Sequence, residues 1–488
     1  LTMAFSPTDE RLLIKATAAG ETGTRAFLVN EPGQAAAPVP GGYIVHEARW
    51  ARSGDALLIS AVVGYTANHA PLLSLVAMDA TAQTGSERLV SGSHRITDLF
   101  ERPDGGLTAV FEARKATRKL IISTRPDETL VVSSDLAAAE PVWSPDGQRL
   151  LFGEQVAPGY SAVYAVEPGV EPILVSGDVL VSERPLWLSD SRRALLVAPG
   201  TAAARGSRGY LGHAAGGAPA SLGVMERVVF VPGTDRVLYR APGPPAGVYV
   251  RDLSDPPSDP VLVAEGYDGA APDPTGERCL VFREAERGLE AAVAPLSAGP
   301  VTPLAGTHRY LVWSPNGASV ASIATDGEPR VVIFSADGTP RAEVPAAVAA
   351  VAFSPDGGRL AGVLTAPDGP AITVLWDLTG QELGRVPWPD RMRPMSSLDG
   401  ALFAGMLPTS APTLTWSPDG TRTHVVGLSE DGLVEMRTIL WEERANMPSV
   451  FAGSLSDFAW SPDGSHLAAL TYRVVQAPGE DALVDPPQ

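Results

Sequence analysis

The stretch Trp143-Ser144-Pro145-Asp146-Gly147 decides the fold of this chain, because copies of it recur from one end to the other. Intact copies also begin at Phe353, Trp416 and Trp460, and altered copies begin at Phe5, Trp50, Phe100, Trp187, Phe230, Pro272 and Trp313. Successive copies stand 40 to 50 residues apart, except for one step of 63 residues between 353 and 416. A nearly fixed period in this range is typical of repeat architectures.

The four residues after the aromatic residue spell out a tight turn. Pro145 presets the backbone of the second turn position, Asp146 suits the third, and Gly147 accepts the left-handed conformation that closes a hairpin. Aliphatic runs follow the turn, such as 149–152 after this copy and 359–364 after the copy at Phe353. Each copy therefore predicts a β-hairpin.

Each repeat also holds two further strand-like runs, which lie at 161–166 and 172–175 in the repeat that begins at Trp143. Four short strands make one antiparallel sheet, and such a sheet cannot bury both of its faces alone. Sheets of this size stack radially into β-propellers. We therefore expect an all-β fold: tandem β-propellers built from about eleven to twelve four-stranded antiparallel blades.

The number of copies argues for two propellers. Eleven copies are clear, and 397–403 reads as a degenerate twelfth turn, whereas a single propeller typically holds four to eight blades. We expect a first propeller of about six blades over residues 1–265 and a second of five to six blades over residues 266–488. Splits of six plus six and of seven plus five blades both fit the sequence.

The aromatic residue before each turn is predicted to pack between neighbouring blades. Six of the nine tryptophans occupy this position: Trp50, Trp143, Trp187, Trp313, Trp416 and Trp460. Large apolar rings at a fixed point of every repeat are typical of a core. The aspartate of each turn is interpreted first as a turn former, because its side chain bonds readily to nearby backbone groups.

Composition excludes several classes of protein. The formal charge of −19 and the pI near 4.8 argue against nucleic acid as a partner. The single cysteine, Cys279, rules out an internal disulfide framework and a cysteine-rich metal site, and its position on a strand predicts a buried thiol. No apolar run reaches the length of a membrane span, so we expect no direct membrane crossing.

Motifs of catalysis are missing from the sequence. There is no Gly-x-Ser-x-Gly elbow, no His-Glu-x-x-His and no phosphate-binding loop, and the seven histidines are scattered. We therefore predict no catalytic, cofactor-binding or metal-binding residues. Histidines and carboxylates from different blades that converge on a central channel remain the open alternative.

One irregular loop carries the residue types that are enriched at protein interfaces. It lies in the long step between repeats and contains Trp388, Arg391, Met392, Arg393 and Met395, with prolines that stiffen it. We predict that this loop binds a partner. The alternative is that Trp388 fills the channel or the seam between propellers.

The aromatic-Ser-Pro-Asp-Gly phrase, followed by Arg-Leu and an aliphatic strand, resembles the TolB-like, WD-repeat-like β-propeller family. The resemblance covers nearly the whole chain and is strongest at 143–147, 353–357, 416–420 and 460–464. It implies a propeller fold and extracytoplasmic protein binding. Peptidase relatives in this family add a hydrolase domain, whose nucleophile motif this chain lacks, so the resemblance carries no catalytic residues across.

These observations favour a non-catalytic scaffold that mediates protein–protein interaction. We expect an accessory or structural subunit of a cell-envelope or membrane-associated assembly, located outside the cytoplasm in the periplasm or at the cell surface. The alternative is an enzyme or small-ligand binder, of hydrolase or lyase type, that uses a propeller's central channel.

Overall fold

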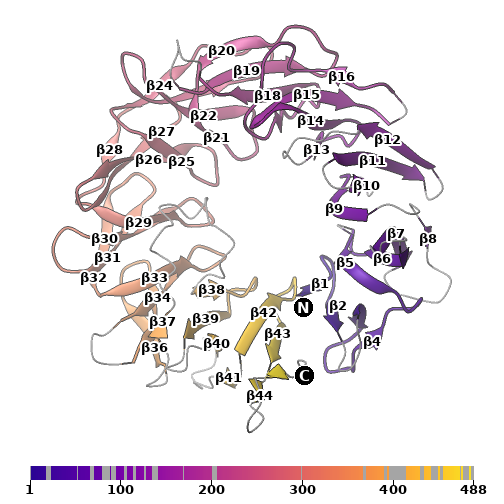
Figure 1. Cartoon of the computed structure of the whole chain (residues 1–488). Coiled ribbons are helices and arrows are strands. Elements are labelled where there is room, and N and C mark those ends of the chain that lie inside the picture. The colour runs from indigo at the N-terminus through magenta and orange to yellow at the C-terminus, as the bar shows by residue number, and fades with distance from the viewer. Residues whose placement is uncertain are drawn as a thin grey trace. The chain divides into compact units, whose positions relative to one another are not determined.

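A computed structural model gives the tertiary structure of the chain. It describes residues 2–17, 23–51, 53–65, 71–79, 88–89, 95–103, 107–113, 117–125, 128–133, 141–168, 170–200, 206–297, 299–365, 370–388, 393–394, 414–428, 434–440, 449–450, 454–472, 474–475 and 483–484. Within these ranges every regular element is a β-strand, so the all-β fold class is confirmed (Figure 1).

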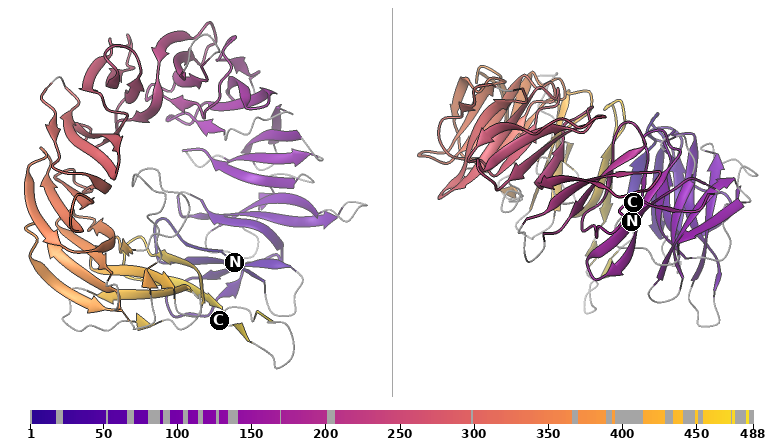
Figure 2. Two further views of the ribbon diagram at one scale, coloured as in Figure 1. Left: turned by 60° about the vertical axis from the view of Figure 1, so that its left-hand side comes forward. Right: turned by 90° about the horizontal axis from the view of Figure 1, so that it is seen from above.

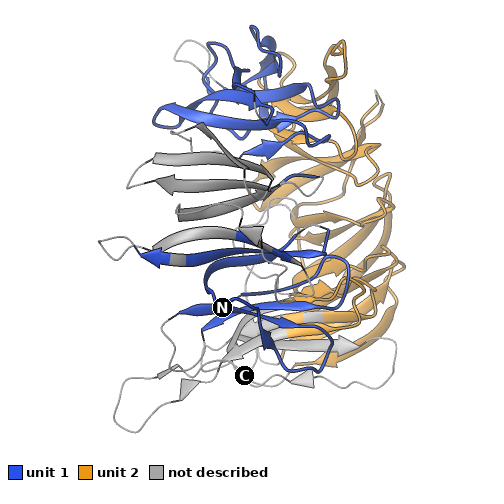
Figure 3. Cartoon of the chain, turned by 90° about the vertical axis from the view of Figure 1, so that its right-hand side faces the viewer, with its two compact units in different colours: residues 1–226 blue, residues 227–488 orange. Residues whose placement is uncertain are grey.

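The first 226 residues form one compact unit, drawn in blue in Figure 3. Its strands make five four-stranded antiparallel sheets, in each of which the strands follow one another in chain order. The sheets are β1 (Thr2–Phe5), β2 (Leu12–Thr17), β3 (Thr24–Val29) and β4 (Ala37–Pro38); β5 (Ile44–Trp50), β6 (Ala56–Tyr65), β7 (Pro71–Asp79) and β8 (Arg88–Leu89); β9 (Arg95–Glu101), β10 (Leu107–Ala113), β11 (Thr117–Arg125) and β12 (Glu128–Ser133); β13 (Val142–Trp143), β14 (Leu150–Ala157), β15 (Tyr160–Val166) and β16 (Ile173–Leu174); β17 (Leu186–Trp187), β18 (Arg193–Ala198), β19 (Arg208–His213) and β20 (Ala220–Val224).

Residues 227–488 form the second compact unit. Its sheets, of four, eight, four, five, two and two strands, also follow chain order for the most part. They are β21 (Glu226–Phe230), β22 (Arg236–Ala241), β23 (Gly247–Asp252) and β24 (Val261–Glu265); β25 (Gly269–Pro272), β26 (Arg278–Ala285), β27 (Gly288–Pro295), β28 (Thr302–Pro303), β29 (His308–Trp313), β30 (Ser319–Ala324), β31 (Arg330–Ser335) and β32 (Pro340–Pro345); β33 (Val348–Phe353), β34 (Arg359–Leu364), β35 (Ile372–Asp377) and β36 (Glu382–Pro387); β37 (Arg393–Pro394), β38 (Leu414–Trp416), β39 (Arg422–Leu428), β40 (Val434–Leu440) and β41 (Ser449–Val450); β42 (Ser454–Trp460) and β43 (Leu467–Tyr472); β44 (Val474–Val475) and β45 (Leu483–Val484).

Within each unit, successive sheets stack face to face, as the blades of a propeller do (Figure 2). The second strand of a repeat is buried on both faces, as all six residues of β30 and the middle four of β34 show. The fourth strand is largely exposed, as in β32 and β36. Because sheets cover both faces of the second strand, it consists mainly of apolar and small residues, and the polar residues it contains, such as Ser319 and Ser322 of β30, are buried as well.

The hydrophobic cores lie between neighbouring repeats. In one of them Ile323 and Ile333 of β30 and β31 pack with Val351 of β33 and Val374 of β35. In another, Leu151 of β14 lies in the same cluster as residues of β18. Each repeat thus obtains its buried surface from the next one, which is the reason why a single four-stranded sheet would not suffice.

The predicted set of eleven to twelve four-stranded blades is wrong for the described residues, which form only seven four-stranded sheets. Two repeats merge into the eight-stranded sheet because Leu289 of β27 pairs with His308 of β29. The last repeats contribute five-stranded and two-stranded sheets instead of full blades. The doubtful twelfth turn at 397–403 lies outside the described residues.

The predicted boundary between two propellers, at 265/266, stays a prediction. The compact units divide at 226/227, but compactness alone does not establish a closed ring of blades. Over the described part of the chain, no helix has the length and hydrophobicity needed to span a membrane.

Candidate functional site

The repeated turn is built around a buried serine. Ser354 donates its hydroxyl hydrogen to Asp356 Oδ1 (2.5 Å) and accepts the backbone N–H of Arg359 (2.9 Å). Gly357 donates its N–H to the Ser354 carbonyl at a φ of 70°, which glycine adopts freely. The hydrogen bond from Ser354 is the main reason why the pKa of Asp356 lies below its usual value.

This arrangement recurs along the chain. The serine is completely buried in six copies: Ser6, Ser144, Ser314, Ser354, Ser417 and Ser461. Asp146, Asp419 and Asp463 each accept the hydroxyl of their serine and a backbone N–H two residues on. The interpretation of the aspartates as turn formers is confirmed, because their Oδ1 atoms already accept hydrogen bonds within the turn.

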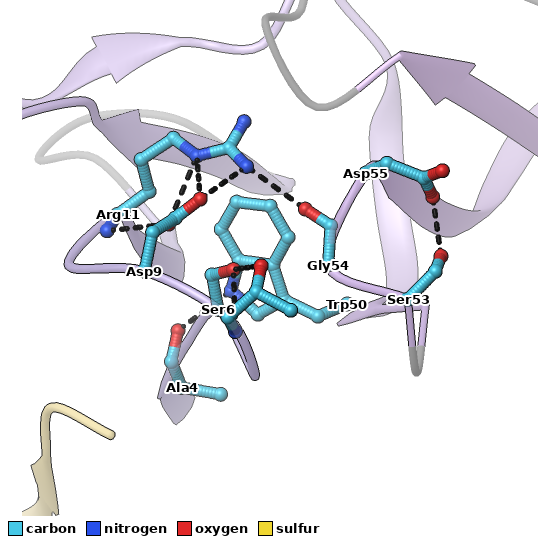
Figure 4. Close-up of polar contacts among 9 residues, drawn as sticks. Ala4, Ser6, Asp9, Arg11, Trp50, Ser53, Gly54 and Asp55 are labelled. Atoms are coloured by element: carbon cyan, nitrogen blue, oxygen red, sulfur yellow. Dashed lines mark hydrogen bonds and ion pairs between the residues drawn. The ribbon is translucent and has the colours of Figure 1, made fainter. Parts of the chain in front are cut away.

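The regular spacing of the tryptophans follows from their contacts, because their indole groups join neighbouring repeats. Trp50 donates its Nε1 hydrogen to the carbonyl of Ala4 (2.9 Å), one repeat earlier (Figure 4). The same bond to the preceding repeat is made by Trp187 to Val142, Trp313 to Ala271 and Trp416 to Ala352. The prediction that these rings pack between repeats is confirmed.

An arginine that follows the turn makes a second link across five of the seams between neighbouring repeats in the described part of the chain. Arg11 is held by a bidentate ion pair with Asp9, donates to the Gly54 carbonyl (2.8 Å) of the next repeat, and stacks over Trp50 at 5.1 Å (Figure 4). Arg149, Arg236, Arg359 and Arg422 reach the corresponding carbonyls of Ser191, Gly276, Gly420 and Gly464. These charged hydrogen bonds fix the turns of adjacent repeats to one another.

One seam replaces the arginine by an asparagine. Ser319 occupies the arginine position in the repeat of Trp313. In the same turn Asn316 takes the place of aspartate and donates its Nδ2 hydrogen to the Asp356 carbonyl (2.8 Å) of the next repeat. The amide therefore restores the link that the missing arginine would have made.

Two side chains of types that often act in catalysis, a histidine and a cysteine, are buried in the cores. His308 Nδ1 lies 2.6 Å from Ser322 Oγ, and both residues are completely buried. Burial lowers the pKa of His308 to about 4, so the ring is neutral at pH 7. Burial also raises the pKa of the Cys279 thiol, with a contribution from the Asp273 charge. A substrate cannot reach either group, so we interpret both as structural; the prediction of a buried Cys279 is confirmed.

The loop predicted to bind a partner divides into two parts in the structure. Trp388 is only 3 % exposed, packs with Ala371, Leu375 and Val386, and donates its indole hydrogen to Thr373 Oγ1 (2.8 Å). Trp388 is thus a core residue, and the prediction that the loop around it binds a partner stays a prediction. Its apolar ring is held by the sheet β33–β36, and its polar atom is satisfied there.

The other members of that loop remain a prediction. Arg393 belongs to β37, and its side chain is not among those described. Arg391, Met392 and Met395 lie outside the described residues.

Exposed apolar side chains gather instead on the repeat that contains β13–β16. Nine large hydrophobic residues of the described chain are exposed, and six of them fall between 156 and 180: Val156, Tyr160, Val170, Ile173, Leu174 and Leu180. Three lie close together in the sequence on the outer edge strand β16 and the connection before it. We call Val170, Ile173 and Leu174, with the residues between them, the 170–174 segment. Contiguous exposed apolar patches are typical of interaction surfaces, so this segment is a candidate for one.

A pocket of about 330 Å³ adjoins this segment, at the seam with the sheet β17–β20. Val170 and Ile173 line it together with Arg149, the seam arginine, whose guanidinium also forms an ion pair with Glu167 (2.6 Å). Arg192 and His213, from the repeat that contains β17–β20, also line it. The pocket therefore combines apolar surface with charged groups of both signs.

Ser191, which precedes the pocket residue Arg192, has an uncommon backbone conformation. It stands where intact turns have glycine, and its φ is 56° although it carries a side chain. Its hydroxyl accepts the N–H of Asp146 (3.0 Å), one repeat earlier, and its carbonyl accepts from Arg149. The serine therefore adds a seam hydrogen bond that glycine lacks, immediately before Arg192.

Sequence reasoning missed the 170–174 segment. The one signal was an apolar pair, Ile173-Leu174, next to Pro172 and Glu171 in the outermost strand. The sequence predicts this pair as part of a strand, and whether a strand residue is exposed depends on which surfaces the neighbouring repeats cover.

Comparison with known proteins supports no narrower assignment. No protein-family profile matches the chain, and no curated protein matches its sequence. Similar solved structures include a eukaryotic initiation factor (14 % identity, TM-score 0.41, covering 77 % of this chain and 96 % of that one), a protein assigned as TolB from Agrobacterium tumefaciens (17 %, 0.27, 43 % and 82 %) and the tricorn protease (11 %, 0.30, 96 % and 54 %).

At these identities and TM-scores the likenesses say nothing about function. The class of protein rests on the chain's own sheets: it is an all-β protein with a propeller-like arrangement of small antiparallel sheets.

Proposed function

We propose that this chain is a non-catalytic β-propeller scaffold that binds a partner protein, and that the 170–174 segment belongs to the binding surface. The observation that carries the proposal is the gathering of six exposed large apolar residues on one repeat. Isolated exposed apolar residues are ordinary on a protein surface, whereas a concentration of them is typical of an interaction site.

The seams support a scaffold role. Tryptophan and arginine links join successive repeats at their turns, so a partner would meet a surface that is already ordered. Binding to an ordered surface loses little conformational entropy, which favours affinity.

The setting of the partner is part of the same proposal. The net charge of −19 favours a protein over a nucleic acid. The resemblance of the repeat to TolB-like propellers suggests a cell-envelope or membrane-associated assembly outside the cytoplasm. An enzyme or small-ligand binder of hydrolase or lyase type, using a central channel, stays the alternative prediction.

We also propose that the repeats divide into two propellers near residue 265. Expression of residues 1–265 and 266–488 separately tests this division. Two soluble products with cooperative unfolding transitions are expected; aggregation of both would contradict it.

Native purification of the protein, followed by mass spectrometry of what migrates with it, tests the scaffold role. The isolated partner is then offered to Val170→Asp and Ile173→Asp variants. Val261→Asp and Leu383→Asp are matched controls, because these residues are similarly exposed (41 % and 50 %) and lie on other sheets. We expect the controls to retain the partner and the 170–174 variants to lose it.

Two results would contradict the proposal. One is a protein that purifies without any stoichiometric partner. The other is a partner that binds all four variants equally, which would place the binding surface elsewhere.

A further inference from the structure

The pocket beside the 170–174 segment is lined by apolar residues and by charged residues from two neighbouring repeats. Resting on the scaffold function proposed above, we infer that it receives one apolar side chain of the partner protein, in a segment that carries an acidic residue on one side of that anchor and a basic residue on the other.

The apolar part of the pocket is large enough for one side chain. Val170 and Ile173 are 50 % and 40 % exposed and line the pocket with Ala165, Val166 and Ala214. A volume of about 330 Å³ lies at the lower end of the range for binding pockets. Leu174, which is 37 % exposed, follows Ile173 in β16 and is not in the pocket lining, because successive side chains of a strand point to opposite faces of the sheet.

The charged residues that line the pocket come from two neighbouring repeats. Glu167 and Glu171 come from the connection between β15 and β16, whereas Arg192 and His213 come from the sheet β17–β20. Arg149 and Glu167 neutralise each other through their 2.6 Å ion pair. Arg192 from one repeat and Glu171 from the other then remain as the charges open to a ligand.

Hydrogen bonds position Arg192 and His213, the basic residues of the pocket, in the absence of a partner. The backbone carbonyl of Arg192 accepts the N–H of Ala214 (2.7 Å). His213 Nδ1 accepts the N–H of Ala215 (3.1 Å), so in the neutral ring the hydrogen sits on Nε2, which can donate to a carboxylate. An acidic residue of the partner therefore meets a guanidinium and an N–H donor on this side.

This arrangement selects against segments with charges of a single sign. A purely basic segment would meet Arg192, and a purely acidic segment would meet Glu171. A segment with one charge of each sign satisfies both residues, and electrostatic complementarity of this kind sets register and specificity.

Four fluorescent peptides of one length test the inference. All carry a central leucine; two have Asp and Lys two residues away in either order, one has Asp on both sides, and one has Lys on both sides. Fluorescence anisotropy measures their binding to the full-length protein. We expect one mixed peptide to bind about tenfold more tightly than either peptide with a single sign of charge.

Charge reversal locates the effect. Arg192→Glu is expected to weaken the preferred mixed peptide about tenfold and to favour the Lys/Lys peptide, and Glu171→Lys is expected to favour the Asp/Asp peptide. Arg287→Glu and Glu286→Lys make the same changes at exposed residues of the turn between β26 and β27, and should leave all four affinities unchanged.

The inference is overturned if the mixed peptides bind no more tightly than the others, or if their advantage survives both reversals in the pocket. A partner that is lost from Ile173→Asp but kept by Arg192→Glu and Glu171→Lys would leave the scaffold function standing and refute the charge pattern alone.

Discussion

Two of the tryptophans between repeats allow the stability contribution of the indole hydrogen bond to be separated from that of ring packing. Trp50 and Trp143 lie in the same unit, are 6 % and 9 % exposed, and each carries an arginine over its ring, at 5.1 Å for Arg11 and 5.6 Å for Arg102. They differ in one respect. Trp50 donates to the Ala4 carbonyl, whereas Trp143 Nε1 is buried without a hydrogen-bond partner among the described residues.

Replacing each tryptophan by phenylalanine therefore has a shared part and a distinct part. Both changes remove the same ring volume and weaken the same kind of cation–π contact. Trp50→Phe also removes a hydrogen bond worth about 1 kcal/mol, and the exposed Ala4 then regains water. Trp143→Phe instead removes an unpaired buried donor, which relieves about 1 kcal/mol. We expect Trp50→Phe to be the more destabilising change by about 2 kcal/mol.

Urea titration of the full chain, followed by circular dichroism and by fluorescence, measures the two free energies of unfolding. Each transition is fitted separately, because two compact units need not unfold together. Equal losses for the two variants would refute the reasoning, since they would show that ring packing alone accounts for the tryptophan at each seam.

Three further predictions concern single residues. Lowering the pH from about 6.5 to about 4 should reduce the free energy of unfolding by an amount on the order of 3 kcal/mol through His308, because the unfolded chain binds a proton at that histidine while the folded chain, with its pKa of about 4, does not. Urea titrations across this range should show that the free energy of unfolding depends less on pH in His308→Gln than in the wild type. An unchanged pH dependence would contradict the assignment to His308. Asn316→Asp should lower the free energy of unfolding by about 1 kcal/mol, because it removes a side-chain hydrogen bond that joins these two turns and places an oxygen next to the Asp356 carbonyl. A urea midpoint equal to that of the wild type would show that the seam does not need this bond. Ser191→Ala should lower the free energy of unfolding by about 1 kcal/mol, and Ser191→Gly should lower it much less. Both variants lose the hydrogen bond from the Asp146 N–H, but only glycine adopts a φ of 56° without strain. Thermal unfolding of the two variants measures the difference, and an alanine variant more stable than the glycine variant would contradict the argument.

The sequence alone was enough to predict the hairpins, because each turn is a local structure. Ser354, Asp356 and Gly357 bond to one another and to Arg359 within six residues, so their conformation depends little on the rest of the chain. The period of the aromatic residue likewise predicted that Trp50 and Trp416 would pack between repeats, since only a repeated neighbour can cover a repeated ring.

The tertiary structure decided the number of complete blades and the candidate site. Leu289 pairs with His308 across two repeats, and no local pattern predicts that merger. Exposure is also a property of neighbours. The sequence predicts Trp388 either in a partner-binding loop or in an interior position, and the structure shows the ring enclosed by Thr373 and the sheet around it. Ile173 is predicted only as a strand residue, and it lies exposed on an outer edge strand. The conformation of a turn is set by hydrogen bonds between residues close together in the chain. Which side chains are exposed depends on which repeats cover one another, and therefore on contacts between residues far apart in the chain.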